Sequence, residues 1–143
     1  MENNLSGLVE VDYRIIDSRL EGISIFQYES LELKKYFNVV MLKISAITGA
    51  VIPPDARFIE IIRDEIVDFL LKFGYSNLTI SEIILAFNLN SSIDMRYPVG
   101  IDLSKIELFG AHLNVDYISR VLHNYTTIRN LLDRKLENTI DGY

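Results

Sequence analysis

The chain has 143 residues, of which 49% are apolar and 24% are charged, so it has an ordinary globular balance and enough length for one hydrophobic core. Its formal net charge of −6 disfavours nonspecific binding to nucleic-acid phosphates, because the long-range field repels them. It has no cysteine, which excludes disulfides, thiolate metal sites and cysteine nucleophiles.

The first thirty residues have their own pattern. Apolar residues alternate with charged ones over Val9–Ile15, the period of a half-buried strand, and Ile23–Tyr28 is rich in β-branched and aromatic residues. Turn-forming residues separate the two runs, so we expect a β-hairpin. The alternative is a loosely held arm, because two strands alone are marginally stable.

The next two elements are predicted to be helices over residues 31–47 and 55–73. Ser30 is placed to cap the first helix, and Gly49 lies just past its end. The second helix follows Pro53 and Pro54, with Asp55 at the positive end of its dipole. The expected inner stripe of the first helix consists of Leu33, Tyr36, Phe37, Val40, Ile44 and Ile47.

Two further helices are predicted over residues 80–88 and 115–137. Thr79 and Glu82 have the spacing of a capping box, in which each side chain bonds to the backbone amide of the other. Asn114 is placed to cap the last helix. Between these helices we expect a loop over residues 88–100 and a short helix over 104–109.

Together these elements predict a mainly α fold, a compact helical bundle of four to five helices with a small N-terminal β-hairpin or arm. We expect a single domain over residues 1–143, with the β element in 1–29 and the helical core in 30–140. No apolar run approaches the roughly 20 residues that a membrane helix needs, so we expect no membrane partner and a cytoplasmic location.

The residues of familiar catalytic and metal sites are missing from the sequence. His112 and His123 are eleven positions apart, too far along one helix to share a metal ion. No phosphate-binding loop and no nucleophile elbow is present. The sequence therefore predicts no enzyme activity, no cofactor and no catalytic or metal-binding residue.

The basic residues of the last predicted helix have two interpretations, contact with nucleic acid or a helix face that is simply solvated. The last predicted helix is locally basic, and four residues could supply cations and stacking groups: Arg96, Arg120, Tyr125 and Arg129. Arg120 and Arg129 lie nine positions apart, so they point to opposite sides of a helix. Any nucleic-acid binding is therefore expected to be weak.

Protein binding is the favoured function class. The chain has eight tyrosines, a residue type enriched at interfaces. It also has apolar residues outside single helical stripes, such as Ile59, Val67, Leu71, Ile128 and Leu131. The acidic N-terminal region supplies four candidate contacts: Glu10, Asp12, Tyr13 and Tyr28. The alternative for the extra apolar residues is one large core. Self-association into a homo-oligomer is a further alternative.

Several short runs together suggest a family. They are Ile47–Gly49 (ITG), Pro53–Asp55 (PPD), Leu78–Ile83 (LTISEI), Ala86–Phe87 (AF) and Val115–Leu122 (VDYISRVL), followed by Tyr125 and Arg129. Over residues 45–130 the chain resembles small helical proteins of bacteriophages and related mobile elements that are encoded beside DNA-replication genes. The resemblance implies an accessory to phage DNA replication, similar to a helicase loader but without an ATP-binding loop, acting in the host cytoplasm.

The expected function is thus a non-enzymatic adaptor that binds a protein partner, in the first place within a phage replication complex. The alternatives are a phage inhibitor of a host defence or regulatory protein, whose acidic N-terminal region would occupy a basic cleft, and a virion or assembly component.

Overall fold

The computed structural model describes residues 7–91, 96–97, 101–102 and 105–141, and this part of the chain is mainly helical. The elements are α1 (Glu10–Leu20), the 3-10 helix η2 (Ile25–Gln27), α2 (Ser30–Thr48), α3 (Ala56–Lys72), α4 (Ile80–Ser91), β1 (Arg96–Tyr97), β2 (Ile101–Asp102) and α5 (Val115–Asp141). The two short strands pair antiparallel, with Arg96 opposite Asp102.

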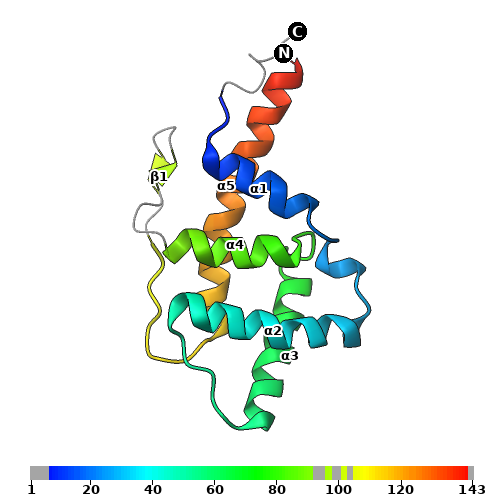
Figure 1. Ribbon diagram of the computed structural model, residues 1–143, viewed down its shortest axis with the longest axis vertical. Helices are drawn as coiled ribbons and strands as arrows, with labels where there is room; N and C mark the ends of the chain where they lie inside the picture. Colours follow the sequence, from blue (N-terminus) through cyan, green and yellow to red (C-terminus); the bar gives the residue numbers. More distant parts are fainter. Residues whose placement is uncertain (1–6, 92–95, 98–100, 103–104, 142–143) are drawn as a thin grey trace.

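Helix α4 is the centre of the bundle. It packs against α1, α2 and α5, while α3 packs against α2 and α5. Figure 1 shows α5 running along the long axis of the molecule, with α1, α4 and α2 crossing in front of it. The fully buried side chains come from all five α-helices and their connections; the largest include Phe37, Phe87, Tyr125, Ile15, Ile25 and Leu70.

The predicted capping box at the start of α4 is confirmed. The amide of Glu82 donates to Thr79 Oγ1 and the amide of Thr79 donates to Glu82 Oε1, both at 3.1 Å. Leu78 and Ile83 are buried on either side of it, as a hydrophobic staple requires. The box therefore fixes both the first turn of α4 and the direction in which the chain enters it.

Most of the other predicted helix ends are also close to those observed. The predicted cap Ser30 is wrong, because Ser30 is the first residue of α2 and the N-cap residue is Glu29, with no side-chain hydrogen bond. Gly49 ends α2 in the left-handed conformation, with φ of 76°. Asp55 caps α3 by accepting from the amide of Arg57 at 2.8 Å, and Asn114 Oδ1 accepts from the amide of Tyr117 at 2.8 Å. Helix α4 continues to Ser91 and α5 to Asp141, beyond the predicted ends.

The predicted β-hairpin over residues 9–15 and 23–28 is wrong, because residues 10–20 form α1. The same stretch has a second, helical spacing in which Leu8, Val11, Ile15 and Ile16 pack against the core. Asp12 stabilises the helical form locally, since its Oδ2 accepts from the amide of Val9 at 2.9 Å and caps the first turn. The segment is not a loose arm either, because Ile15 is fully buried.

The second predicted strand keeps a trace of β pairing. Ser24 forms an isolated antiparallel bridge with Thr79, and the amide of Ile25 donates to the carbonyl of Leu78 at 2.9 Å. The chain then turns into η2.

The predicted helix over 104–109 is wrong for residues 105–109, which have no regular secondary structure. Residue 104 and most of the predicted loop over 88–100 lie outside the described residues.

Candidate functional site

Two of the predicted surface residues belong to a buried polar cluster between α4 and α5. Glu82 is fully buried, and its Oε2 accepts a hydrogen bond of 2.7 Å from the hydroxyl of Tyr125. Arg129 Nε lies 2.8 Å from the same oxygen. The Arg129 N–H is not aligned for a hydrogen bond, so this contact is an ion pair held by proximity of charge. The cluster joins the first turn of α4 to the middle of α5.

The cluster keeps Tyr125 protonated. Burial raises the pKa of the Tyr125 phenol far above its ordinary value, and its hydrogen bond to the Glu82 carboxylate raises it further. The cationic groups of Arg129 and Arg19 act in the opposite direction but are outweighed. Because the phenol and its carboxylate partner are both buried, this cluster holds the fold together and offers no open surface to a ligand.

The four candidate nucleic-acid contacts therefore do not form one surface. Tyr125 and Arg129 point into the bundle, while Arg120 is exposed and forms an ion pair with Asp116, one turn earlier on α5. Arg96 lies in β1, and its side chain is outside the described residues. Arg120 is thus the one cation of this set that the described side chains leave exposed to solvent.

The four candidate contacts of the N-terminal region also do not form one surface. Asp12 is fully buried and forms an ion pair of 2.8 Å with Lys135 of α5. Glu10 and Tyr13 are exposed on α1, and Tyr28 is half-buried beside Tyr36. Asp12 has a structural role in holding α1 on α5, and the other three candidates lie on two separate elements, Glu10 and Tyr13 on α1 and Tyr28 beside α2.

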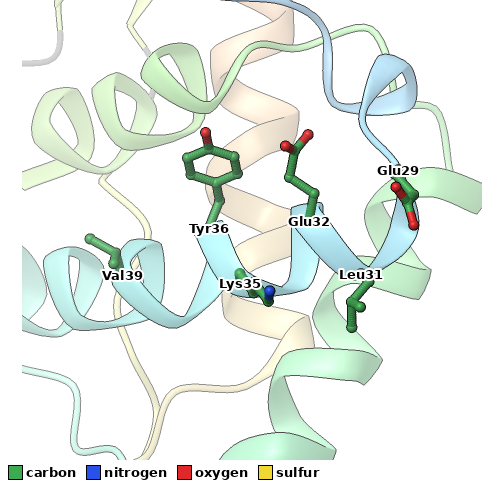
Figure 2. A pocket seen from close by; sticks show the side chains of 6 residues that line it. All are labelled: Glu29, Leu31, Glu32, Lys35, Tyr36 and Val39. Atoms are coloured by element: carbon green, nitrogen blue, oxygen red, sulfur yellow. The ribbon is translucent and has the colours of Figure 1, made fainter.

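Tyr36, the ring that Tyr28 contacts, lines a hollow along α2. The hollow has a volume of about 590 Å³ and is lined by Glu29, Leu31, Glu32, Lys35, Tyr36 and Val39. Figure 2 looks onto the open face of α2, with Lys35 near its middle, Glu32, Tyr36 and Val39 along one edge and Leu31 along the opposite edge. We call this surface the α2 groove, and it is the candidate functional site.

The apolar part of the α2 groove continues along the helix. Leu31 is 62% exposed, Val39 52% and Leu42 64%. These positions lie opposite the buried stripe of α2, which contains Leu33, Phe37, Val40, Met41 and Ile44. The helix is therefore apolar on two opposite faces, one packed against the core and one open to solvent. An open apolar helix face of this kind is typical of an interaction surface.

A second hollow, of about 370 Å³, adjoins the same side of α2. It is lined by Arg14, Asp17, Ser18 and Glu21 of α1, Lys43 of α2, and Ser81, Ile84, Leu85 and Asn88 of α4. Lys43 is one turn beyond Val39, so the row Glu32, Tyr36, Val39 and Lys43 borders both hollows. This hollow is mostly polar, which leaves the α2 groove as the more apolar of the two.

The sequence interpretation placed Tyr36 on the inner stripe and did not single out Leu31, Val39 or Leu42. Tyr36 is in fact half-exposed. The sequence does contain a signal for this second apolar face, because positions 31, 39 and 42 have helical spacing and form a stripe of their own. The apolar residues named as lying outside a stripe belong instead to the core, where Val67 and Ile128 are buried and Ile59 and Leu131 pack against it. The exception is Leu71, which is partly exposed.

No family model, curated protein or solved structure matches this chain. Among the described residues, no helix is long and apolar enough to cross a membrane, and no group of three or more potential metal ligands lies together.

Proposed function

We propose that this protein is a non-enzymatic adaptor whose α2 groove binds a segment of another protein. The observation that carries the proposal is the second apolar face of α2, formed by Leu31, Val39 and Leu42 beside the half-exposed ring of Tyr36. Covering such a face releases its hydration water, and this is the usual driving force of protein association.

The shape of the site favours a helical or extended segment of a partner. The groove follows α2 over several turns, from Glu29 to at least Val39, and its lining alternates apolar and charged side chains. An amphipathic segment lays its apolar side chains into a groove of this kind and keeps its polar side chains at the rim.

The charge of the site favours a basic partner. Glu29 and Glu32 line the groove against the single cation Lys35, and the whole chain carries a net charge of −6. A basic segment is attracted by this field, whereas nucleic acids and anionic membrane surfaces are repelled. The resemblance to phage proteins encoded beside replication genes suggests that the partner is a component of a DNA-replication complex.

The test is site-specific photocrosslinking in the native host cells. Benzoylphenylalanine replaces Val39 in the groove or, as a matched control, Phe58 of α3, which is also a large apolar side chain and is 56% exposed. We expect a protein to crosslink through position 39 and not through position 58. The captured protein is then purified and its Kd for the chain is measured.

In the purified pair we expect Val39→Asp to weaken binding about tenfold or more, because it places a charge in the apolar centre of the interface, while Phe58→Asp changes the Kd less than twofold. The far-UV circular dichroism of both variants should match that of the unmodified protein. The proposal is overturned if position 39 captures no protein, if it captures only a second copy of this chain, or if Val39→Asp leaves the Kd unchanged.

A further inference from the structure

The end of the α2 groove near Glu29 has a chemistry that its apolar part lacks. The rings of Tyr28 and Tyr36 have centroids 5.2 Å apart and planes inclined at 60°, so they form a corner with aromatic faces on both sides. Glu32 lies one turn before Tyr36 on α2, and Figure 2 shows its carboxylate rising beside the Tyr36 ring. We call this the aromatic and acidic corner, defined by Tyr28, Glu32 and Tyr36, and Glu29 lies farther along the groove, at the start of α2.

The electrostatics of the corner favour a cation. The face of a tyrosine ring carries partial negative charge and attracts ammonium and guanidinium groups. The pKa of Tyr28 is raised, first by burial and then by repulsion from the ionised forms of Tyr36 and Glu32, of which only the Glu32 carboxylate is charged at neutral pH. The corner therefore opposes additional negative charge, which is the same property that attracts a positive group.

Among the residues that the structure describes, no basic side chain forms an ion pair with the carboxylate of the corner. Lys35 is the nearest basic side chain of the groove lining, and Figure 2 shows that it does not extend toward the Tyr36 ring. Within the described part of the chain, neither Glu29 nor Glu32 has an ion-pair partner. Both carboxylates are thus available to a positive group from outside.

We propose that the corner of Tyr28, Tyr36 and Glu32 binds an arginine side chain of the partner protein. Arginine is favoured over lysine because its planar guanidinium can stack on a tyrosine ring and still donate two parallel hydrogen bonds to a carboxylate. This inference rests on the proposed function, since it names the residue that would orient the partner in the α2 groove.

The test is an NMR titration of the full chain with Nα-acetyl-arginine amide. Nα-acetyl-citrulline amide is the matched control, because it has nearly the same shape and no charge. We expect saturable shifts in the backbone amides of Tyr28, Glu32 and Tyr36 with the arginine probe, and binding at least about fivefold weaker with citrulline.

Single substitutions test whether the arginine probe binds at the proposed corner. Glu32→Gln and Tyr36→Leu should each weaken the arginine probe about threefold to fivefold, whereas Glu60→Gln, which removes an exposed carboxylate on α3, should leave it unchanged. Equal binding of the two probes, shifts confined to other parts of the surface, or no shift at all would overturn the inference. The crosslinking test depends on Val39, so failure of the arginine site and failure of the α2 groove give different results.

Discussion

The hydroxyl of Tyr125 in α5 donates a hydrogen bond of 2.7 Å to a carboxylate oxygen of Glu82 in α4, 43 residues away in the sequence. The other carboxylate oxygen of Glu82 accepts from the amide of Thr79 and closes the capping box. One buried acidic residue therefore both begins α4 and joins it to α5. The stability of the bundle should depend strongly on this pair.

Replacing Tyr125 by phenylalanine tests this dependence. The variant keeps the ring in the core but removes the donor to a buried carboxylate, so we expect a loss of about 2 kcal/mol in the free energy of unfolding. Urea denaturation followed by circular dichroism measures it. Tyr13→Phe, at an exposed position on α1, is the control and should change stability by less than about 0.5 kcal/mol. Equal midpoints for the two variants would contradict the assigned role.

The same tyrosine should make stability depend on alkaline pH. The unfolded chain loses a phenolic proton near pH 10, whereas folded Tyr125 has a raised pKa and keeps its proton. Above about pH 10 the unfolded state therefore binds fewer protons than the folded state, and stability falls as pH rises. Tyr28 and Tyr117 also have raised pKa values and contribute in the same direction. Urea midpoints between pH 8 and 11 should fall less steeply in Tyr125→Phe than in the unmodified protein.

Thr79→Ala should cost about 1–2 kcal/mol of stability. The capping hydroxyl alone accounts for about 1 kcal/mol. Thr79 Oγ1 also donates to the carbonyl of Ser18 at 2.7 Å and so ties the end of α1 to the start of α4. Thr79→Ser keeps the hydroxyl and is the control, with a smaller loss expected in the same denaturation measurement. A midpoint in the alanine variant equal to that of the serine variant would show that the hydroxyl is dispensable.

Two ion pairs of α5 should differ greatly in their contribution to stability. Lys135→Met removes the partner of the fully buried Asp12, and we expect a cost of about 3 kcal/mol because a buried carboxylate loses its counter-charge. Arg120→Met breaks the exposed pair with Asp116 and should cost less than about 0.5 kcal/mol. Thermal or urea unfolding of the two variants side by side measures the difference. A similar effect of both would argue against the buried position of Asp12.

Direct binding to DNA should be absent or weak. The net charge is −6, Tyr125 is buried, and Arg129 is engaged with Glu82, so Arg120 has no cationic or stacking neighbour from the predicted set among the described side chains. Titration of labelled single- and double-stranded DNA near physiological salt should show no saturable binding at micromolar protein. Saturable binding that is lost in Arg120→Ala would favour nucleic-acid recognition over the adaptor function.

The helical part of the fold could be predicted because its signals are local. The pair Thr79 and Glu82, and the caps Asp55 and Asn114, depend on residues within one turn of each helix end, and each was found where the sequence placed it. The α1 segment could not be predicted from its spacing alone, because Val9–Ile15 satisfies the period of a strand and that of a helix. The choice depends on distant partners, Asp133 and Lys135 of α5.

The candidate site was harder to predict than the fold. Tyr125 and Arg129 have the composition of a nucleic-acid contact, and only the position of Glu82 on the facing helix shows that they point inward. Conversely, Tyr28 was predicted as a partner contact, but its pairing with Tyr36 depends on how η2 leads into α2. Single-sequence patterns identify amphipathic helices, but they do not say which of two apolar faces remains open.

The ion pairs of α1 also bear on how the chain matures during its synthesis. Arg19 contacts Asp133, and Asp12 contacts Lys135, at sequence separations of 114 and 123 residues. A helix that precedes α2 to α5 in the chain is thus held by residues of the last described helix. While the ribosome is still producing α2 and α3, the helices α4 and α5 that pack against α1 have not yet been made, so the apolar side of α1 with Ile15 lacks its final covering and exposes surface of the kind that chaperones bind.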